Sequence, residues 1–274
     1  MAFHVTIITG ASDGIGAELA RQLAFAARHK PAQTTVLILA ARDKAKLQAV
    51  ALECEALGAT VMIRPTDVGQ QDPCRGLVAD TVARFGRIDT LINNAGMSAH
   101  ALLEDVTDLS WYEDLMRVNL WGSVWVTHAA LPHLKASRGL IVAVSSLAGL
   151  VGVPGRTAYS ATKFAMNGFF ESLRVEMLPH GVGVTMAYPG VVATEIRRRG
   201  YNAEGQAAGK SGLVEDGAMS VETCAHLIVK GMNTRQRDIV MSTKGKLSRW
   251  IKLLAPSLVD RLALAALKKD VRPH

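Results

Sequence analysis

The sequence has few cysteines and no long hydrophobic run. Its 274 residues include only three cysteines, Cys54, Cys74 and Cys224, which are far apart and form no Cys-x-x-Cys pair. We therefore expect neither a disulfide framework nor a metal site, and a reducing, cytoplasmic location is favoured. No run approaches the roughly 18 apolar residues of a membrane span, and the apolar stretch after Met1 is too short for a secretory signal.

Acidic residues are scarce at the C-terminal end, which accounts for most of the net charge of +7. Residues 244–274 contain eight lysines and arginines against only Asp260 and Asp270, a surplus of six. The preceding part of the chain is nearly neutral as a whole. A basic surface for nucleic acid is therefore not expected there.

Hydrophobic residues make up 49% of the chain, ample for a core. Strand-like runs, most of them continuously apolar, alternate with helix-length segments. This alternation predicts an α/β fold in which a parallel sheet is covered by helices on both faces. The predicted strands are residues 3–9, 34–41, 59–64, 88–92, 139–145, 182–188 and 237–242.

The first predicted strand runs directly into a glycine-rich turn, Gly10-Ala-Ser-Asp-Gly14-Ile-Gly16, and a predicted helix over residues 17–28 follows. Glycines in this context let the backbone approach a pyrophosphate, and the helix N-terminus offers it free amide groups. A flexible loop without a ligand is the alternative interpretation. The order of strand, turn and helix favours a dinucleotide-binding unit.

A second group of residues combines a hydroxyl, a phenol and an ammonium: Ser146, Tyr159 and Lys163. Tyr159 and Lys163 are four residues apart and share one helix face. The lysine charge can favour the phenolate form of the tyrosine, and the serine can hydrogen-bond the same substrate oxygen. Because such pairs are also common on helix surfaces, the interpretation depends on the glycine-rich turn in the same chain.

Four motifs in register resemble the classical short-chain dehydrogenase/reductase family. They are Gly10-x-x-x-Gly14-x-Gly16, Asn93-Asn94-Ala95-Gly96, Ser146 with Tyr159 and Lys163, and Pro189-Gly190-x-x-x-Thr194. The similarity runs from residue 3 to about residue 195. It implies a single Rossmann-type, doubly wound parallel sheet of about seven strands over residues 1–243, the NAD(P)-binding catalytic domain, with a C-terminal helical extension over residues 244–274.

The resemblance also implies a reaction, the transfer of a hydride between a nicotinamide and a carbonyl or secondary alcohol. Tyr159 would be the acid for reduction and the base for oxidation, and Lys163 would lower its pKa and hold the ribose. Ser146 would polarise the substrate oxygen, while Asn119 would hold a water on the lysine. The implied catalytic residues are thus Ser146, Tyr159, Lys163 and Asn119.

By the same resemblance, the cofactor would contact the glycine-rich turn and the residues that follow the later strands. Asp67 and Val68 match the pair beside the adenine ring, and Val192 and Thr194 would meet the nicotinamide carboxamide. The implied cofactor-binding residues are Gly10, Ser12, Asp13, Gly14, Ile15, Gly16, Arg42, Asp67, Val68, Asn94, Ala95, Gly96, Tyr159, Lys163, Pro189, Gly190, Val192 and Thr194.

The end of the second predicted strand bears on which nicotinamide cofactor is preferred. An arginine there suits the 2′-phosphate of NADP, whereas an acidic residue suits the free ribose hydroxyl of NAD. Arg42 has this position, and Ser12 could add a phosphate contact. Asp13 stands where many NADP-preferring members have a basic residue, and Asp13 and Asp43 would both repel a phosphate. NADP(H) is predicted as the preferred cofactor, with NAD(H) as the alternative.

Several features bear on the substrate. Apolar residues follow Ser146. The segments Ser-Ser-Leu-Ala-Gly and Tyr-Ser-Ala-Thr-Lys-Phe-Ala are similar to those of the 11β-hydroxysteroid-dehydrogenase-like branch of the family. A small apolar, lipid- or steroid-like carbonyl or alcohol is therefore expected. Residues 195–216 are rich in glycine and alanine, where the family has a lid over the site. The apolar residues that follow Ser146 are Leu147, Leu150, Val151, Val153 and Pro154.

The tail carries an apolar stripe, with Leu247, Trp250, Ile251 and Leu254 at helical spacing and Lys246, Arg249 and Lys252 off the stripe. Ser257 is predicted to cap a second helix. This basic amphipathic tail either packs on the domain, the pocket or another subunit, or makes a peripheral contact with an anionic membrane.

Two expectations concern partners. The helices predicted at residues 110–136 and 157–178 are rich in tryptophan and phenylalanine, so a homodimer or homotetramer is expected to form through them. The competing function, from a different class, is a non-catalytic dinucleotide sensor or scaffold that docks through the tail. The complete Ser146, Tyr159 and Lys163 set favours the enzyme.

Overall fold

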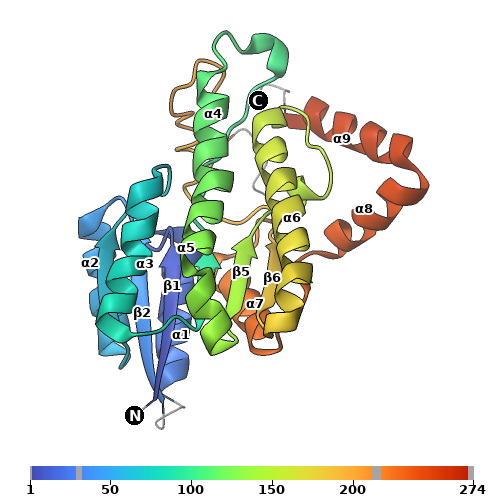
Figure 1. The fold of residues 1–274 in the computed structure, drawn as a ribbon. Coiled ribbons are helices and arrows are strands. Elements are labelled where there is room, and N and C mark those ends of the chain that lie inside the picture. Colours follow the sequence, from blue (N-terminus) through green and yellow to red (C-terminus); the bar gives the residue numbers. More distant parts are fainter. Residues whose placement is uncertain (1, 29–32, 212–216, 271–274) are drawn as a thin grey trace.

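A parallel seven-stranded sheet forms the centre of the computed structural model, which describes residues 2–28, 33–211 and 217–270 (Figure 1). The strand order is β3-β2-β1-β4-β5-β6-β7, and every neighbouring pair is parallel. The predicted sheet is therefore confirmed. The strands are β1 (Ala2–Thr9), β2 (Gln33–Ala41), β3 (Thr60–Pro65), β4 (Thr90–Asn93), β5 (Leu140–Val144), β6 (Gly183–Tyr188) and β7 (Asp238–Val240).

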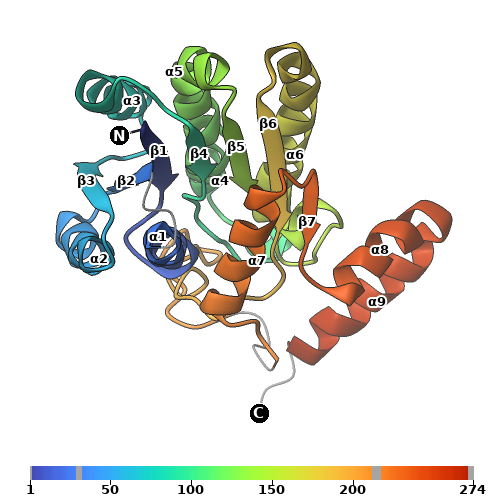
Figure 2. The same ribbon diagram turned by 90° about the horizontal axis from the view of Figure 1, so that it is seen from below.

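Helices cover both faces of this sheet. α3, α5 and α6 lie on one side and α1, α2 and α7 on the other (Figure 2). A π-helical segment, Arg117–Trp121, joins α4 to α5. The helices are α1 (Gly14–Ala27), α2 (Lys44–Ala56), α3 (Gln71–Phe85), α4 (Ser110–Met116), α5 (Gly122–Ser137), α6 (Thr157–Met177), α7 (Val221–Asn233), α8 (Thr243–Leu254) and α9 (Pro256–Asp270).

The continuous apolar strands are explained by this double cover. Alternate side chains of β1 enter different halves of the core, with Val5 and Ile7 on the side of α3, α5 and α6 and Ile8 on the opposite side. All three are fully buried. Burial of each such side chain contributes roughly 1.5–3 kcal/mol to the stability of the fold.

The strand order also determines where a ligand can bind. β1 pairs with β2 on one side and β4 on the other, so the direction of winding reverses between β1 and β4. In open α/β sheets the loops on the two sides of such a reversal diverge, which leaves a crevice at the carboxyl ends of the strands. The glycine-rich turn after β1 and the loop after β4 both lie at this edge.

α8 and α9 form a helical hairpin that projects from the edge of the sheet beyond β7 (Figure 1, Figure 2). The second helix begins at Pro256, one residue before the predicted cap Ser257. Proline suits the first helical position because its fixed backbone angle is helical and it has no amide hydrogen to satisfy. Residues 271–274 of the predicted tail and 212–216 of the predicted lid lie outside the described residues. Within the described part of the chain, no helix is both long enough and apolar enough to span a membrane.

Candidate active site

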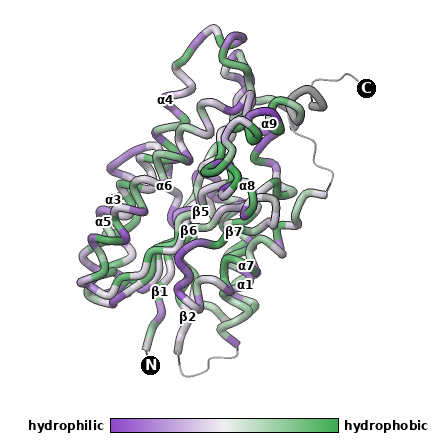
Figure 3. Tube along the Cα trace, turned by 90° about the vertical axis from the view of Figure 1, so that its right-hand side faces the viewer, coloured by the Kyte–Doolittle hydropathy of each residue, from purple (hydrophilic) through white to green (hydrophobic). Residues whose placement is uncertain are grey.

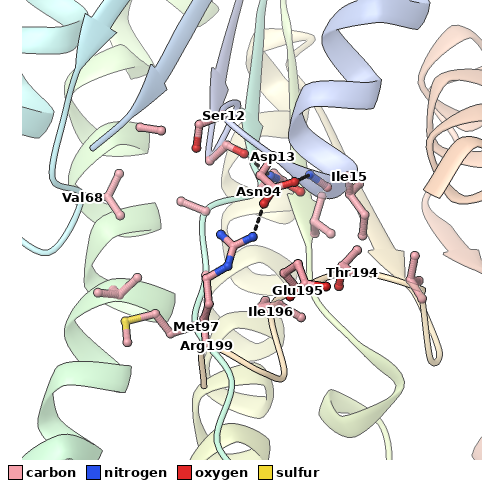
Figure 4. Close-up of a pocket in the computed structure, with 18 of the residues that line it drawn as sticks. Ser12, Asp13, Ile15, Val68, Asn94, Met97, Thr194, Glu195, Ile196 and Arg199 are labelled. Carbon is pink, nitrogen blue, oxygen red and sulfur yellow. Dashed lines mark hydrogen bonds and ion pairs between the residues drawn. The ribbon is translucent and has the colours of Figure 1, made fainter. Parts of the chain in front are cut away.

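A cavity of about 640 Å³ opens at the carboxyl ends of the strands. Among the residues predicted for cofactor binding or catalysis, all except Gly16 and Asn119 line this cavity. Four residues of the predicted lid form the wall opposite the glycine-rich turn: Glu195, Ile196, Arg197 and Arg199 (Figure 4). The predicted residues, although spread from position 10 to position 194, thus meet at one place.

The glycine-rich turn has no room for side chains at two positions. A Cβ on Gly16 would lie 2.2 Å from the carbonyl oxygen of Gly10, and Gly10 itself has a φ of +67°. Gly16 therefore stands behind the turn and allows α1 to begin close to β1. The side chain of Asp13 caps α1 by accepting a hydrogen bond of 2.7 Å from the amide of Gly14.

The asparagines after β4 tie the crevice together. Asn94 donates hydrogen bonds from Nδ2 to the carbonyl oxygens of Thr9 (3.0 Å) and Gly10 (3.3 Å). Asn93 is buried and donates to the hydroxyl of Thr127 on α5 at 2.9 Å. The Asn94 bonds hold the loop after β4 to the turn after β1, and the Asn93 bond ties the end of β4 to α5.

Ser146, Tyr159 and Lys163 are brought together by β5 and α6. Ser146 follows β5, and the other two lie one turn apart on the face of α6 that meets the sheet; all three are buried. The ammonium of Lys163 donates to the carbonyl oxygen of Val144 at 3.0 Å and lies 5.7 Å from the ring centroid of Tyr159. The neighbouring Ser145 is oriented differently, because its hydroxyl donates to Asn167 at 2.7 Å.

The charges around Tyr159 favour its ionised form. Burial by itself would raise the pKa of Tyr159, but the positive charges of Lys163 and Arg156 and a hydrogen bond from Ser146 more than offset it. The pKa of this phenol therefore lies below its ordinary value. Burial has the opposite effect on Lys163: it disfavours the charged ammonium and lowers its pKa, while attraction by the phenolate opposes that shift.

Asn119 does not line the cavity. It is fully buried in the π-helical segment, where its Oδ1 accepts from the amide of Met97 at 2.7 Å. Its Nδ2 donates to the carbonyl of Met97 and to the hydroxyl of Thr162, both at 3.0 Å. The side chain therefore joins the loop after β4 to α6, directly behind Gly96. Its predicted water contact stays a prediction.

Sequence reasoning missed Arg156. Its guanidinium lies over the ring of Tyr159, 4.0 Å from the centroid, and donates to Ser98 (2.7 Å) and to the carbonyl of Ala99 (3.3 Å). A position three residues before the tyrosine would be one turn away in a helix, but α6 begins only at Thr157, so helical spacing does not indicate this contact. The guanidinium is a second cation beside the phenol.

Two further cations of the cavity were not among the predicted cofactor-binding residues. Lys46 lines it from the first turn of α2, and its closeness in sequence to Arg42 is the signal that could have indicated it. Arg199 extends from the opposite wall and forms an ion pair with Asp13, at the glycine-rich turn (Figure 4). These two residues are 186 positions apart, and nothing local in the sequence indicates their pairing.

Fold and cavity together define a Rossmann-type dinucleotide-binding protein, and comparison with known proteins supplies the family. The short chain dehydrogenase family model matches residues 4–205. "11-beta-hydroxysteroid dehydrogenase-like 4A" of Arabidopsis thaliana is 36% identical over 256 residues, covering 93% of this chain and 82% of that protein. "11-beta-hydroxysteroid dehydrogenase A" of Sesamum indicum is 35% identical over 271 residues, covering 95% and 74%.

A solved structure is also similar. The alcohol dehydrogenase of the archaeon Thermococcus sibiricus, complexed with 5-hydroxy-NADP, superposes with a TM-score of 0.74 at 25% identity and covers 87% of this chain and 96% of its own. The chain belongs to the short-chain dehydrogenase family, whose members are oxidoreductases that bind a nicotinamide dinucleotide. The predicted family and fold are thereby confirmed.

Proposed function

We propose that the protein is an NADP(H)-dependent oxidoreductase that interconverts a carbonyl group and a secondary alcohol, with Tyr159 as acid and base. The main support is the position of Tyr159 in the cavity, beside Ser146 and close to the cations of Lys163 and Arg156. A phenol whose pKa is lowered in this way can exchange a proton with a substrate oxygen nearer to neutral pH. Proton exchange at that oxygen is the part of the reaction that the protein itself must supply.

Each neighbour of Tyr159 has a distinct part in this proposal. In reduction, Tyr159 donates its phenolic proton to the substrate oxygen, and in oxidation it accepts the proton from the alcohol. Ser146 donates a hydrogen bond to the same oxygen, and Lys163 stabilises the phenolate. A bound nicotinamide supplies or accepts the hydride at the carbon. Asn119 positions the loop after β4 against α6 and is further proposed to hold the water that reaches Lys163.

Two cations of the cavity support a dinucleotide with a 2′-phosphate as the cofactor. Arg42 and Lys46 line it at the end of β2 and the start of α2, where the adenosine ribose of a dinucleotide lies in such folds. The predicted repulsion by Asp13 is weakened because its carboxylate caps α1 and pairs with Arg199. These observations support NADP(H) over NAD(H).

An apolar carbonyl compound is the proposed substrate class. The loop that follows Ser146 is apolar, although none of its predicted apolar residues lines the cavity, and the two relatives described above carry names of hydroxysteroid dehydrogenases. We propose a lipid- or steroid-like ketone or alcohol.

A panel of such compounds tests the function directly. Oxidation of NADPH and of NADH is followed by absorbance with ketones, aldehydes and steroid-like carbonyls, and the reverse reaction with the alcohols. Turnover of at least one apolar carbonyl, faster with NADPH, is expected. Tight NADPH binding without turnover of any compound would favour the alternative, a dinucleotide sensor that docks through its tail.

The preference for NADPH is expected to depend on Arg42. Arg42→Ala should weaken NADPH binding by roughly 10- to 100-fold, because one charge-assisted phosphate contact contributes about 1.5–3 kcal/mol. NADH, which has no 2′-phosphate, should bind almost as before. Nicotinamide fluorescence on titration measures both affinities. Equal losses for the two cofactors would mean that Arg42 does not contact the phosphate.

Arg199 is expected to support the binding of both cofactors. Arg199→Ala removes the positive charge that neutralises Asp13 beside the pyrophosphate site, so NADPH and NADH should each bind about tenfold more weakly, a change of about 1.4 kcal/mol. When Asp13→Asn, which retains the helix cap, is combined with Arg199→Ala, part of the lost affinity should be recovered. Arg198→Ala is the matched control, because Arg198 is exposed and pairs only with Glu195 at 3.7 Å among the described residues. A loss confined to NADPH would place Arg199 at the 2′-phosphate instead.

We also propose that the protein forms a homodimer or homotetramer through α4, α5 and α6. The two aromatic sets divide between core and surface: Trp111 and Phe170 are buried, whereas Trp121 and Phe164 are exposed on the outer side. Exposed aromatic residues on neighbouring helices are typical of a surface that a second subunit covers. Sedimentation of the full chain tests this assembly.

A further inference from the structure

The α8–α9 hairpin exposes most of its large apolar side chains, while Ile251 and Val259 are partly buried. Trp250 is 65% exposed and Leu254 85% exposed, although both belong to the predicted apolar stripe. Hydrophobic and hydrophilic residues alternate along both helices (Figure 3). We call the exposed apolar side chains of the hairpin the apolar row: Leu247, Trp250, Leu253, Leu254, Leu258, Leu262 and Leu264.

Polar and charged groups, not the apolar row, attach the hairpin to the domain. Lys252 on α8 donates to the carbonyl oxygen of Leu150 at 2.9 Å and lies 4.6 Å from the ring centroid of Phe164. Arg249 pairs with Asp238 on β7 at 3.2 Å. The hairpin is therefore held with its apolar row outward.

The size and charge of the hairpin indicate what covers this row. Helices of 12 and 15 residues are shorter than the roughly 20 residues needed to cross a bilayer, but they suit a position in the plane of its interface. The surplus of six positive charges in residues 244–274 is attracted by anionic headgroups. Two such tails placed face to face would instead repel each other, and tryptophan is enriched at membrane interfaces.

We propose that the α8–α9 hairpin docks the protein on an anionic membrane surface, with the apolar row at the boundary between headgroups and acyl chains. This docking goes beyond the proposed reaction and does not depend on it. The hairpin adjoins the loop that begins after Ser146, because Gly245 lies against Leu147 and Lys252 against Leu150. Docking therefore holds that side of the active site near the bilayer.

Co-sedimentation of the full chain with vesicles tests the docking. Binding to vesicles of phosphatidylcholine with phosphatidylglycerol is expected to exceed binding to phosphatidylcholine alone by at least about tenfold, and to fall as salt is raised. Trp250→Glu with Leu254→Glu should lower binding by about tenfold or more, because both side chains leave the interface. Leu52→Glu is the matched control: Leu52 is similarly exposed, on α2, and this variant should bind like the unaltered protein.

A second pair of variants separates charge from apolar contact. Lys246→Gln with Arg261→Gln should weaken binding to anionic vesicles at low salt but leave the far-ultraviolet circular dichroism unchanged, since both substitutions are on the hairpin surface. Brominated lipids should quench the fluorescence of the full chain, and Trp250→Phe should remove most of that quenching.

Two results would overturn the proposal. One is equal binding to both kinds of vesicle by the unaltered chain and by the Trp250→Glu, Leu254→Glu variant. The other is dissociation of an oligomer by that variant, measured by sedimentation, without any change in vesicle binding, because a second copy of the chain would then cover the apolar row. Neither readout requires turnover, so failure of the docking is distinct from failure of the proposed reaction.

Discussion

Tyr159→Phe is expected to lower kcat by about 10²- to 10⁴-fold, the range that a positioned acid or base contributes. The substitution removes the proton donor but retains the ring, which lies 4.0 Å from the Arg156 guanidinium. NADPH affinity should therefore change little, and the loss should be in kcat and not in the dissociation constant of the cofactor. Steady-state rates with an active carbonyl compound and NADPH titrations measure the two quantities.

A second tyrosine offers a matched control. The hydroxyl of Tyr112 lies 2.8 Å from that of Thr157 at the start of α6, outside the cavity. Tyr112→Phe removes the same atom from a nearby site and should retain most of the activity. If Tyr159→Phe kept more than a tenth of the original turnover, Tyr159 would not be the acid and base, and the proposed mechanism would be wrong.

Lys163→Met is expected to shift the pH profile as well as to lower the rate. The positive charge of Lys163 lowers the pKa of Tyr159, so its removal raises that pKa. In alcohol oxidation the phenolate is the active form, and the rate should rise with pH at a higher pH than in the unaltered enzyme. In carbonyl reduction the phenol is the active form, so the fall in rate at alkaline pH should also occur at a higher pH than in the unaltered enzyme.

The size of this effect depends on which of the two cations beside Tyr159 is removed. Arg156→Met should shift the profile in the same direction but less, because Lys163 has the larger influence on Tyr159. Lys163→Met should also weaken NADPH binding, as expected for a residue that holds the ribose. Lys230→Met, an exposed lysine on α7, is the control and should leave the profile unchanged. An unshifted profile in Lys163→Met would show that a group other than Tyr159 carries the titration.

Much of the fold follows from local patterns in the sequence. Apolar runs predicted the strands to within two residues at each end, because a strand covered on both faces must be apolar throughout. The glycine-rich turn was recognisable because only glycine permits the close approach of Gly16 to Gly10. The start of α9 was predicted two residues too late, because a cap at Ser257 places the first helical residue at 258, whereas the helix begins at Pro256.

The composition of the cavity was also largely predictable. Residues that end parallel strands meet at one edge of the sheet, so the segments after β1, β2, β3, β4, β5 and β6 had to lie close together. The spacing of Tyr159 and Lys163 placed both on one face of α6. Asn119 does not line the cavity: it lies in the π-helical segment, and its side chain is in the core, bonded to Met97 and Thr162.

The sequence by itself therefore determined the sheet and the glycine-rich turn, since periodicity and spacing along the chain encode them, and its resemblance to a known family implied the grouping of Ser146, Tyr159 and Lys163. Only the tertiary structure decided that Arg199 neutralises Asp13, that Arg156 lies over Tyr159, and that the apolar row of α8 and α9 faces outward. An amphipathic pattern shows that a helix has an apolar face but not what that face meets. Contacts between residues far apart in the chain leave no periodic signal, because they depend on how whole elements pack against one another.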